Sequence, residues 1–262
     1  MTTATITYSP GKFVFHELYT QDPAASKKFY CELFGWTAQD LPIGPDAFYT
    51  RFMLGETMVA GMMPIALIPA PDDQKPPAHW AVYVSVDDVD AATERAVAGG
   101  GTLLSGVHEV PGMGRWSVML DPQGAMFRLY KAAAGDGEDV DGREWGRFCW
   151  ESLATSDVPA AVKFYQDVVG WGTEPMGQMP LFTRKRANGE TVSVASTGPA
   201  HNTPHWGAFV STADANATLA KAKALGAKVL LERTEIPNVG AFAIIDDPND
   251  AALYLFEPAP NS

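Results

Sequence analysis

The sequence predicts an α+β protein of two tandem modules, each containing the order β-helix-β-β-β twice. The stretch KKFYCELFGW at 27–36 returns as VKFYQDVVGW at 162–171, an offset of 135 residues. Later landmarks, such as DPQG at 121–124 and DPND at 247–250, repeat at an offset of 126. A repeat of this length indicates duplicated domains rather than a solenoid, whose period is about 20–50 residues.

The repeat divides the chain into a first module at 1–131, a linker at 132–144 and a second module at 145–262. The linker, AAAGDGEDVDGRE, is small, acidic and glycine-rich, as segments between domains often are. The two offsets differ because the proline-rich segment at 64–77 is longer than its counterpart TGPAHNTP. Surface loops tolerate such insertions, since the entropy of loop closure grows slowly with length.

The elements of the first module follow from local signals. The run KFVFHELYT favours a strand, Asp22 before Pro23 predicts a helix N-cap, and Gly35 predicts the end of that helix. Asp88 predicts the cap of a second helix. The remaining predicted elements are strands at 48–54, 57–63, 80–86, 102–108, 115–120 and 125–130.

The repeated aromatic stretch is interpreted as a packing motif. Phe29 and Tyr30 lie beside Leu33 on a helix that must cover a sheet. Aromatic residues at helical spacing belong to the core, so Tyr30 and its counterpart Tyr165 are assigned to packing and not to chemistry.

Composition excludes several function classes. The net charge is −12, and no run of Lys and Arg is present that could follow a phosphate backbone, so we expect no nucleic-acid partner. The N-terminus has no signal-peptide pattern, and the apolar run at 58–70 is too short to span a bilayer. We expect a cytoplasmic protein without membrane contact. Cys31 and Cys149 alone give no disulfide scaffold or thiolate metal site.

Three motifs carry a family resemblance. They are D-P-x-x-x-x-x-F-Y-x-x-x-F-G-W, a later V-x-D-V-D-A and D-P-x-G before a final strand. Together they resemble the vicinal oxygen chelate superfamily, which includes glyoxalase I, bleomycin-type resistance proteins, fosfomycin resistance enzymes and extradiol dioxygenases. The resemblance covers nearly the whole chain, once per half. It implies modules in which paired βαβββ motifs form a curved mixed sheet with a concave ligand face, but the scaffold hosts many functions.

The resemblance also implies where metal ligands would stand. The first ligand position falls on Phe15 and Trp150, and the second on Ala81 and Gly207. The last falls on Arg128 in one module and Tyr254 in the other. These residues lack the donor groups that a divalent cation needs, so we expect no metal and no cofactor.

Residues near these positions could form a metal site in another way. A one-residue bulge would bring His16 or Glu151 inward, and His79 and His205 recur in the dipeptide HW. However, strand alternation places His16 on the face opposite Glu17. The HW pairs also fit a structural role, in which the His bonds a loop carbonyl and the Trp covers the sheet edge.

The same faces predict a ligand surface rich in aromatic residues and Met, as in pockets for flat organic molecules. The alternative is an ordinary core. In the first module the predicted residues are Phe15, Glu17, Met53, Tyr83, Met119, Arg128 and Tyr130. In the second they are Trp150, Ser152, Phe182, Phe209, Ile244, Tyr254 and Phe256.

Glu17 and Arg128 are the charged residues of these faces. They are predicted to form an ion pair that anchors a carbonyl, phenol or carboxylate of the ligand. Two alternatives are that Glu17 is a catalytic general base and that the pair is an internal salt bridge without a ligand.

Two functions follow. One is a metal-free protein that binds or sequesters a small aromatic, natural-product-like molecule, as antibiotic-binding members of the resembled family do. The other is a glyoxalase-, dioxygenase- or hydroxylase-like enzyme with a relocated metal site or a Glu17 base. A purely structural or signalling module has no sequence feature of its own here. Because two modules share one chain, we expect a monomer.

Overall fold

The computed structural model describes residues 7–137, 139, 143–177, 179–200 and 203–260. Of the predicted linker, positions 138 and 140–142 therefore lie outside the described residues. The β-helix-β-β-β order recurs four times along the chain, which confirms the predicted α+β class of two tandem modules. Among the described residues no helix is long and apolar enough to cross a membrane.

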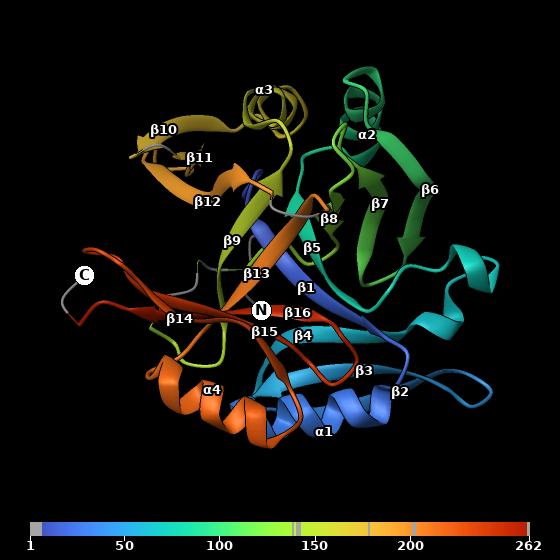
Figure 1. The fold of residues 1–262 in the computed structure, drawn as a ribbon. Helices are drawn as coiled ribbons and strands as arrows, with labels where there is room; N and C mark the ends of the chain where they lie inside the picture. Colours follow the sequence, from blue (N-terminus) through green and yellow to red (C-terminus); the bar gives the residue numbers. More distant parts are fainter. Residues whose placement is uncertain (1–6, 138, 140–142, 178, 201–202, 261–262) are drawn as a thin grey trace, which may run out of the picture. The chain divides into compact units, whose positions relative to one another are not determined.

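The first half of the chain contributes one sheet with the order β2-β3-β4-β1-β5-β8-β7-β6 (Figure 1). Its first motif contains β1 (Phe13–Thr20), α1 (Pro23–Phe34), β2 (Thr37–Gly44), β3 (Ala47–Leu54) and β4 (Thr57–Pro64). The single 3-10 turns η1 (Ile65–Leu67) and η2 (Asp72–Gln74) follow. The second motif contains β5 (His79–Ser85), α2 (Val89–Ala98), β6 (Thr102–Val110), β7 (Gly114–Leu120) and β8 (Met126–Ala132).

The second half contributes a sheet with the equivalent order β10-β11-β12-β9-β13-β16-β15-β14. Its first motif contains β9 (Phe148–Thr155), α3 (Val158–Val169), β10 (Gly172–Met176), β11 (Met179–Lys185) and β12 (Thr191–Pro199). Its second contains β13 (His205–Ser211), α4 (Ala215–Ala224), β14 (Lys228–Ile236), β15 (Gly240–Asp246) and β16 (Ala252–Pro258). Both sheets are curved and mixed, with parallel pairs such as β5 with β8 and β13 with β16.

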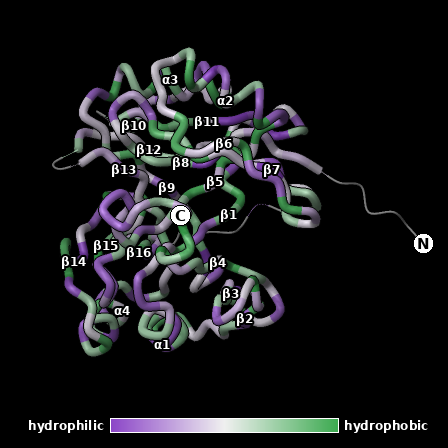
Figure 2. Tube along the Cα trace, turned by 90° about the vertical axis from the view of Figure 1, so that its right-hand side faces the viewer, coloured by the Kyte–Doolittle hydropathy of each residue, from purple (hydrophilic) through white to green (hydrophobic). Residues whose placement is uncertain are grey.

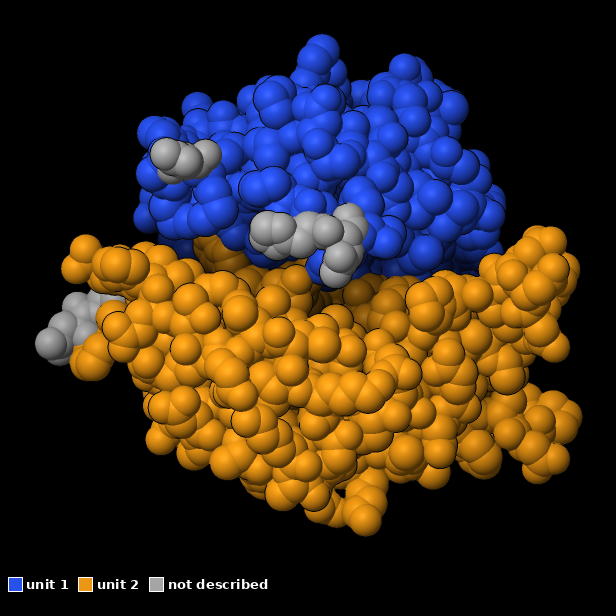
Figure 3. All heavy atoms as spheres, in the orientation of Figure 1, with its two compact units in different colours: residues 1–14, 82–139, 151–206 blue, residues 15–81, 140–150, 207–262 orange. Residues whose placement is uncertain are grey.

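The chain packs into two compact units that do not follow the repeat (Figure 3). Unit 1 contains residues 1–14, 82–139 and 151–206. Unit 2 contains residues 15–81, 140–150 and 207–262. Unit 1 therefore holds α2 and α3, and unit 2 holds α1 and α4, so each unit joins helices from both halves of the sequence. The module boundaries at 131 and 145 remain a prediction from the repeat.

The helix signals act as the sequence predicts. In α1 the Asp22 carboxylate accepts the backbone N–H groups of Ala24 and Ala25, and Gly35 ends the helix at a φ of 72°. Asp88 caps α2 in the same way by accepting the N–H of Ala91. Hydrophilic and hydrophobic positions alternate along the helices, in keeping with one buried and one exposed face (Figure 2).

Aromatic side chains form the core of each unit. In unit 2, Tyr30 of α1 is completely buried, and its ring contacts those of Trp36, Phe52 and Trp80. In unit 1, Tyr165 of α3 is equally buried. Its ring contacts those of Trp171, Phe182 and Trp206, which correspond to the ring partners of Tyr30. The packing role predicted for the repeated stretch therefore holds.

Candidate functional site

A first cluster lies in unit 2, on the face of the sheet that α1 does not cover. Phe15 and Glu17 lie on β1, and Tyr49 lies on β3. Glu17 pairs with Gly61 of the parallel strand β4. A Cβ atom on Gly61 would lie 2.0 Å from the Tyr49 hydroxyl and 2.9 Å from the Phe15 ring. Glycine at 61 therefore lets the Tyr49 ring lie directly over the backbone, beside Phe15.

Tyr49 is the functional candidate that the sequence analysis missed. It is 6% exposed, and its buried hydroxyl lies beside the Glu17 carboxylate. Burial, and then the negative charge of the neighbouring Glu17, raise the pKa of Tyr49 well above its usual value. The phenol therefore stays protonated beside a carboxylate. Alternation along β3 also places Met53 on this face, two positions beyond Arg51.

A second cluster lies in unit 1 and contains three predicted residues. Tyr83 of β5 pairs with Arg128 of β8, and the Arg128 Cζ lies 5.2 Å from the centre of the Tyr83 ring. The rings of Tyr83 and Tyr130 meet edge to face at 5.5 Å. Arg128 is 4% exposed, so this guanidinium is buried against an aromatic face. A buried arginine in this setting can bind an anion or an electron-rich oxygen.

Met119 does not belong to this cluster. The β7–β8 register pairs Met119 with Phe127 and Val118 with Arg128. The Met119 face also carries Ser117, whose hydroxyl bonds Thr93 of α2 at 2.7 Å. Met119 therefore points toward α2. Val118 occupies the position beside Arg128 that was predicted for Met119. The sequence analysis was one residue out of phase on this strand.

The face of β11 on which Phe182 lies also differs from the prediction. Phe182 lies in the core of unit 1, with its ring 4.9 Å from that of Trp171. Its neighbour Leu181 instead pairs with Ser196. The Ser196 hydroxyl donates to Ser152 at 3.0 Å, which places Ser152 on the face opposite Phe182. A register shift between Phe182 and Thr183 accompanies this change of phase.

A third cluster lies in unit 2. The rings of Phe209 and Tyr254 meet edge to face at 4.8 Å, and Phe242 lies 6.3 Å from Phe209. Ile244 pairs with Tyr254, and Phe256 pairs with Phe242, as the predicted face requires. Burial raises the pKa of Tyr254, so this phenol also stays protonated. Trp150 is half-buried on β9, directly after Cys149, whose thiol contacts the Phe209 carbonyl.

The residues at the implied metal positions do not fit a metal. A Cβ atom on Gly207 would lie 2.5 Å from the Tyr254 ring, so a ring fills the space into which a ligand side chain would project. Phe15, Trp150 and Ala81 offer no donor, and Arg128 carries a positive charge. Within the described ranges, no group of three or more His, Cys, Asp or Glu residues could hold a metal ion. The expectation of a protein without a metal remains a prediction.

The histidines considered as alternative ligands have structural contacts. His79 Nδ1 lies 2.9 Å from the Pro77 carbonyl, and His205 Nδ1 lies 2.9 Å from that of Thr203. The predicted bond to a loop carbonyl is therefore confirmed. Trp80 and Trp206 lie in the cores instead of covering a sheet edge. His16 stacks on Phe148 at 3.9 Å, away from the Glu17 face.

The chain belongs to the Glyoxalase/Bleomycin resistance protein/Dioxygenase superfamily, whose family model matches residues 12–129 and 148–253. It is 35% identical over 259 residues to the putative glyoxylase CFP32 of Mycobacterium bovis, with 97% of each chain covered. It is 31% identical over 263 residues to the anthracycline biosynthesis protein DauV of Streptomyces sp. strain C5, covering 95% of this chain and 94% of that protein.

Solved structures show the same fold. The Mn(II)-bound glyoxalase from Novosphingobium aromaticivorans gives a TM-score of 0.65 at 17% identity, covering 95% of this chain and 82% of that one. The substrate complex of homoprotocatechuate 2,3-dioxygenase from Brevibacterium fuscum gives 0.61 at 16% identity, covering 98% and 85%. At such low sequence identities, these similarities show a shared fold and nothing more.

Proposed function

We propose that the protein binds a small aromatic molecule without a metal, on the faces where metal-using relatives hold their ions. The observation that carries this proposal is the buried Arg128 guanidinium against the Tyr83 ring. Arg128 stands where metal-using members of the family would have a residue that binds the metal. An arginine repels a cation there and attracts the carbonyl, phenolate or carboxylate oxygen of an organic ligand. The surrounding rings supply the apolar contact that such a ligand needs.

The other clusters support the same class of ligand. Phe209 and Tyr254 form an aromatic surface in unit 2, and Phe15 lies beside Tyr49 in the same unit. One relative is named an anthracycline biosynthesis protein, and anthracyclines are planar polycyclic aromatic compounds. We propose a ligand of this natural-product-like type. The protein would act as a monomer, because one chain carries both modules. We also propose that it acts in the cytoplasm.

A second candidate function rests on Glu17 and Tyr49. A carboxylate beside a protonated phenol, both almost fully buried, is a combination that can remove a proton from one atom and donate a hydrogen bond to another. Glu17 would be the general base and Tyr49 the donor. The naming of another relative as a putative glyoxylase is compatible with this alternative. A relocated metal site has no comparable observation in its favour.

The first experiment is elemental analysis of the purified protein, together with a thermal-shift screen of divalent metals and polycyclic aromatic compounds. We expect no stoichiometric metal and an increase in Tm with an aromatic compound, since a ligand at one hundred times its Kd stabilises by about 2.7 kcal/mol. Stoichiometric Zn²⁺, Ni²⁺, Mn²⁺ or Fe²⁺ would overturn the metal-free proposal.

The two candidate functions are separated with Glu17→Gln. If the protein only binds, the wild type leaves a stabilising compound chemically unchanged. If it is an acid-base enzyme, the wild type converts the compound, while Glu17→Gln binds it and converts it at least about a hundredfold more slowly.

A further inference from the structure

Unit 1 contains a cavity of about 520 Å³ whose lining includes no residue of the aromatic clusters. Arg184 and Arg186 line it, together with Asn188 from the turn after β11 and Asp139 from the predicted linker. Thr7, Ser9, Ala134, Gly137 and Ala187 complete the lining. The cavity therefore opens beside a cluster of positive side chains in a chain whose net charge is −12.

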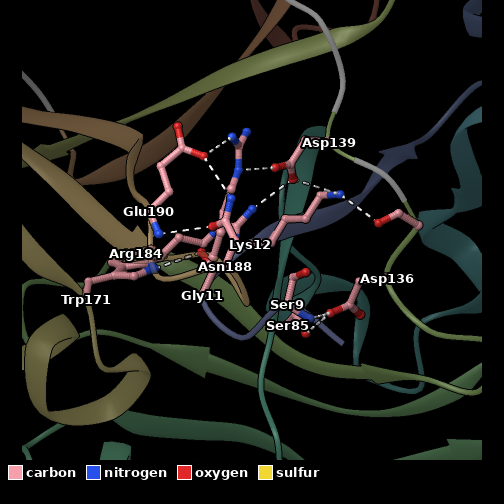
Figure 4. Close-up of polar contacts among 12 residues, drawn as sticks. Ser9, Gly11, Lys12, Ser85, Asp136, Asp139, Trp171, Arg184, Asn188 and Glu190 are labelled. Carbon is pink, nitrogen blue, oxygen red and sulfur yellow. Dashed lines mark hydrogen bonds and ion pairs between the residues drawn. The ribbon is translucent and has the colours of Figure 1, made fainter. Parts of the chain in front are cut away.

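Three cations converge on the single carboxylate of Asp139 (Figure 4). Arg184 Nη2 donates to Asp139 Oδ1 at 2.8 Å, and Arg186 Nε donates to Oδ2 at 2.8 Å. Lys12 Nζ lies 3.2 Å from Oδ1. Burial would raise the pKa of Asp139, but these three cations outweigh it and hold the pKa below its usual value. The carboxylate is therefore charged.

Arg184 has spare capacity for hydrogen bonding. Its side chain is 6% exposed, and its Nε has no hydrogen-bond partner among the residues that the structure describes. A buried guanidinium N–H without an acceptor is costly, because the group has lost its water. An oxyanion in the cavity would satisfy it.

Asp139 is not needed to hold residues 133–136 on the rest of unit 1. The Ala133 N–H donates to the Met113 carbonyl, and the Asp136 N–H donates to the Thr7 carbonyl. The Asp136 carboxylate also accepts the Ser9 N–H at 2.6 Å and the Ser85 hydroxyl at 2.5 Å. These contacts hold residues 133–136 independently of Asp139, so the Asp139 side chain can leave the cations while this segment stays in place.

The charges favour an anion once Asp139 has moved. Lys12, Arg184 and Arg186 then face two carboxylates, those of Asp136 and Glu190, the latter paired with Arg186 at 2.9 Å. Three positive against two negative charges leave one positive charge unbalanced. A single oxyanion restores neutrality, and two arginines are well suited to bind one.

We propose that this cavity is an oxyanion-binding site in which Asp139 is the resident carboxylate and the phosphate or carboxylate group of a small molecule takes its place. The site would be separate from the aromatic surfaces of the proposed function. Arg184 and Arg186 would donate hydrogen bonds to the oxyanion, and the cavity would hold the rest of the molecule.

The test is titration calorimetry of the full-length chain with inorganic phosphate and with malonate, at constant ionic strength. Asp139→Asn removes the resident carboxylate, and we expect it to bind one of these anions at least tenfold more tightly than the wild type. Adding Arg184→Gln to Asp139→Asn should abolish the gain. Phosphate as the tighter probe would assign a phosphate-bearing ligand, and malonate a carboxylate.

The matched control is Asp90→Asn, which removes a carboxylate from Arg115 in the same unit, where Arg115 keeps Glu109. This variant should bind both anions as weakly as the wild type. Equal affinities in Asp139→Asn and Asp90→Asn would overturn the proposal and leave Asp139 a purely structural ion pair. Circular dichroism and thermal melts confirm that each variant is folded. If Asp139→Asn does not fold, the wild type is tested instead, and failure of phosphate or malonate to raise its Tm above the chloride control overturns the proposal.

Discussion

The Tyr30 hydroxyl donates a hydrogen bond to the carboxylate of Asp247 at 2.9 Å, joining residues 217 positions apart in the sequence. Trp80 Nε1 donates to the same Tyr30 oxygen. Unit 1 repeats the arrangement, because Tyr165 donates to Asp121 at 3.1 Å. In each unit, the repeated FY stretch of one half thus bonds the DP turn of the other half.

The first prediction concerns stability. Tyr30→Phe removes the hydroxyl that bonds Asp247 Oδ2 and the Trp80 N–H, while Asp247 Oδ1 keeps its bonds to the backbone N–H groups of Asn249 and Ala251. We expect it to lower the free energy of unfolding by about 1–3 kcal/mol. Urea unfolding measures the change, and Tyr8→Phe is the control, because that hydroxyl bonds only a part-buried carbonyl of Ala132. Equal losses in the two variants would contradict a special role for the Tyr30 bond.

The second prediction concerns pH. Burial raises the pKa of Asp247 in the folded protein, so ionisation costs the folded state more than the unfolded state. The stability contribution of Asp247 is therefore present below its unfolded pKa of about 3.9 and is lost as the pH rises through the folded pKa. We expect the unfolding free energy of the wild type, minus that of Asp247→Asn, to fall across this range.

Asp88→Asn provides a control of opposite sign. The backbone N–H of Ala91 bonds the Asp88 carboxylate and lowers its pKa. The corresponding difference for Asp88→Asn should rise with pH. Parallel slopes for the two variants would show that the burial of Asp247 does not govern its titration.

Local sequence signals predicted most of the fold. Asp22 and Gly35 marked the ends of α1, and the aromatic repeat marked both cores. A strand was expected after Gly35, but the bounds of β2 at Thr37–Gly44 were not predicted, because its sequence TAQDLPIG is mostly exposed and contains a proline. The regrouping of helices into two compact units depends on contacts such as Tyr30 with Asp247, which no local pattern encodes.

The candidate site was harder to predict, because it depends on strand phase. An error of one residue exchanges the two faces of a strand, and this happened at Met119 and Phe182. Tyr49 was overlooked, although alternation from Met53 places it on the same face. The role of Gly61 beneath the Tyr49 ring becomes visible only in three dimensions.

The third prediction concerns ligand binding by Arg128. If the Arg128 guanidinium anchors an oxygen of the aromatic ligand, Arg128→Ala should weaken the binding of phenolic or anionic compounds by about tenfold or more. Arg115→Ala is the matched control, because Arg115 is a partly exposed arginine of β7 that pairs with Asp90 and Glu109. Unchanged affinity of Arg128→Ala across a panel that stabilises the wild type would remove the anchor role.

The fourth prediction tests the steric argument at the implied metal position. A Cβ atom on Gly207 would lie 2.5 Å from the Tyr254 ring, so Gly207→Ala should lower the free energy of unfolding by about 1–3 kcal/mol through overpacking. Gly106→Ala is the control, since no atom lies within 4 Å of the added Cβ. Adding Tyr254→Ala should make the cost of Gly207→Ala much smaller, because the opposing ring is gone. A double-mutant cycle without coupling would contradict the inferred contact, and space for a ligand side chain at 207 would again have to be considered.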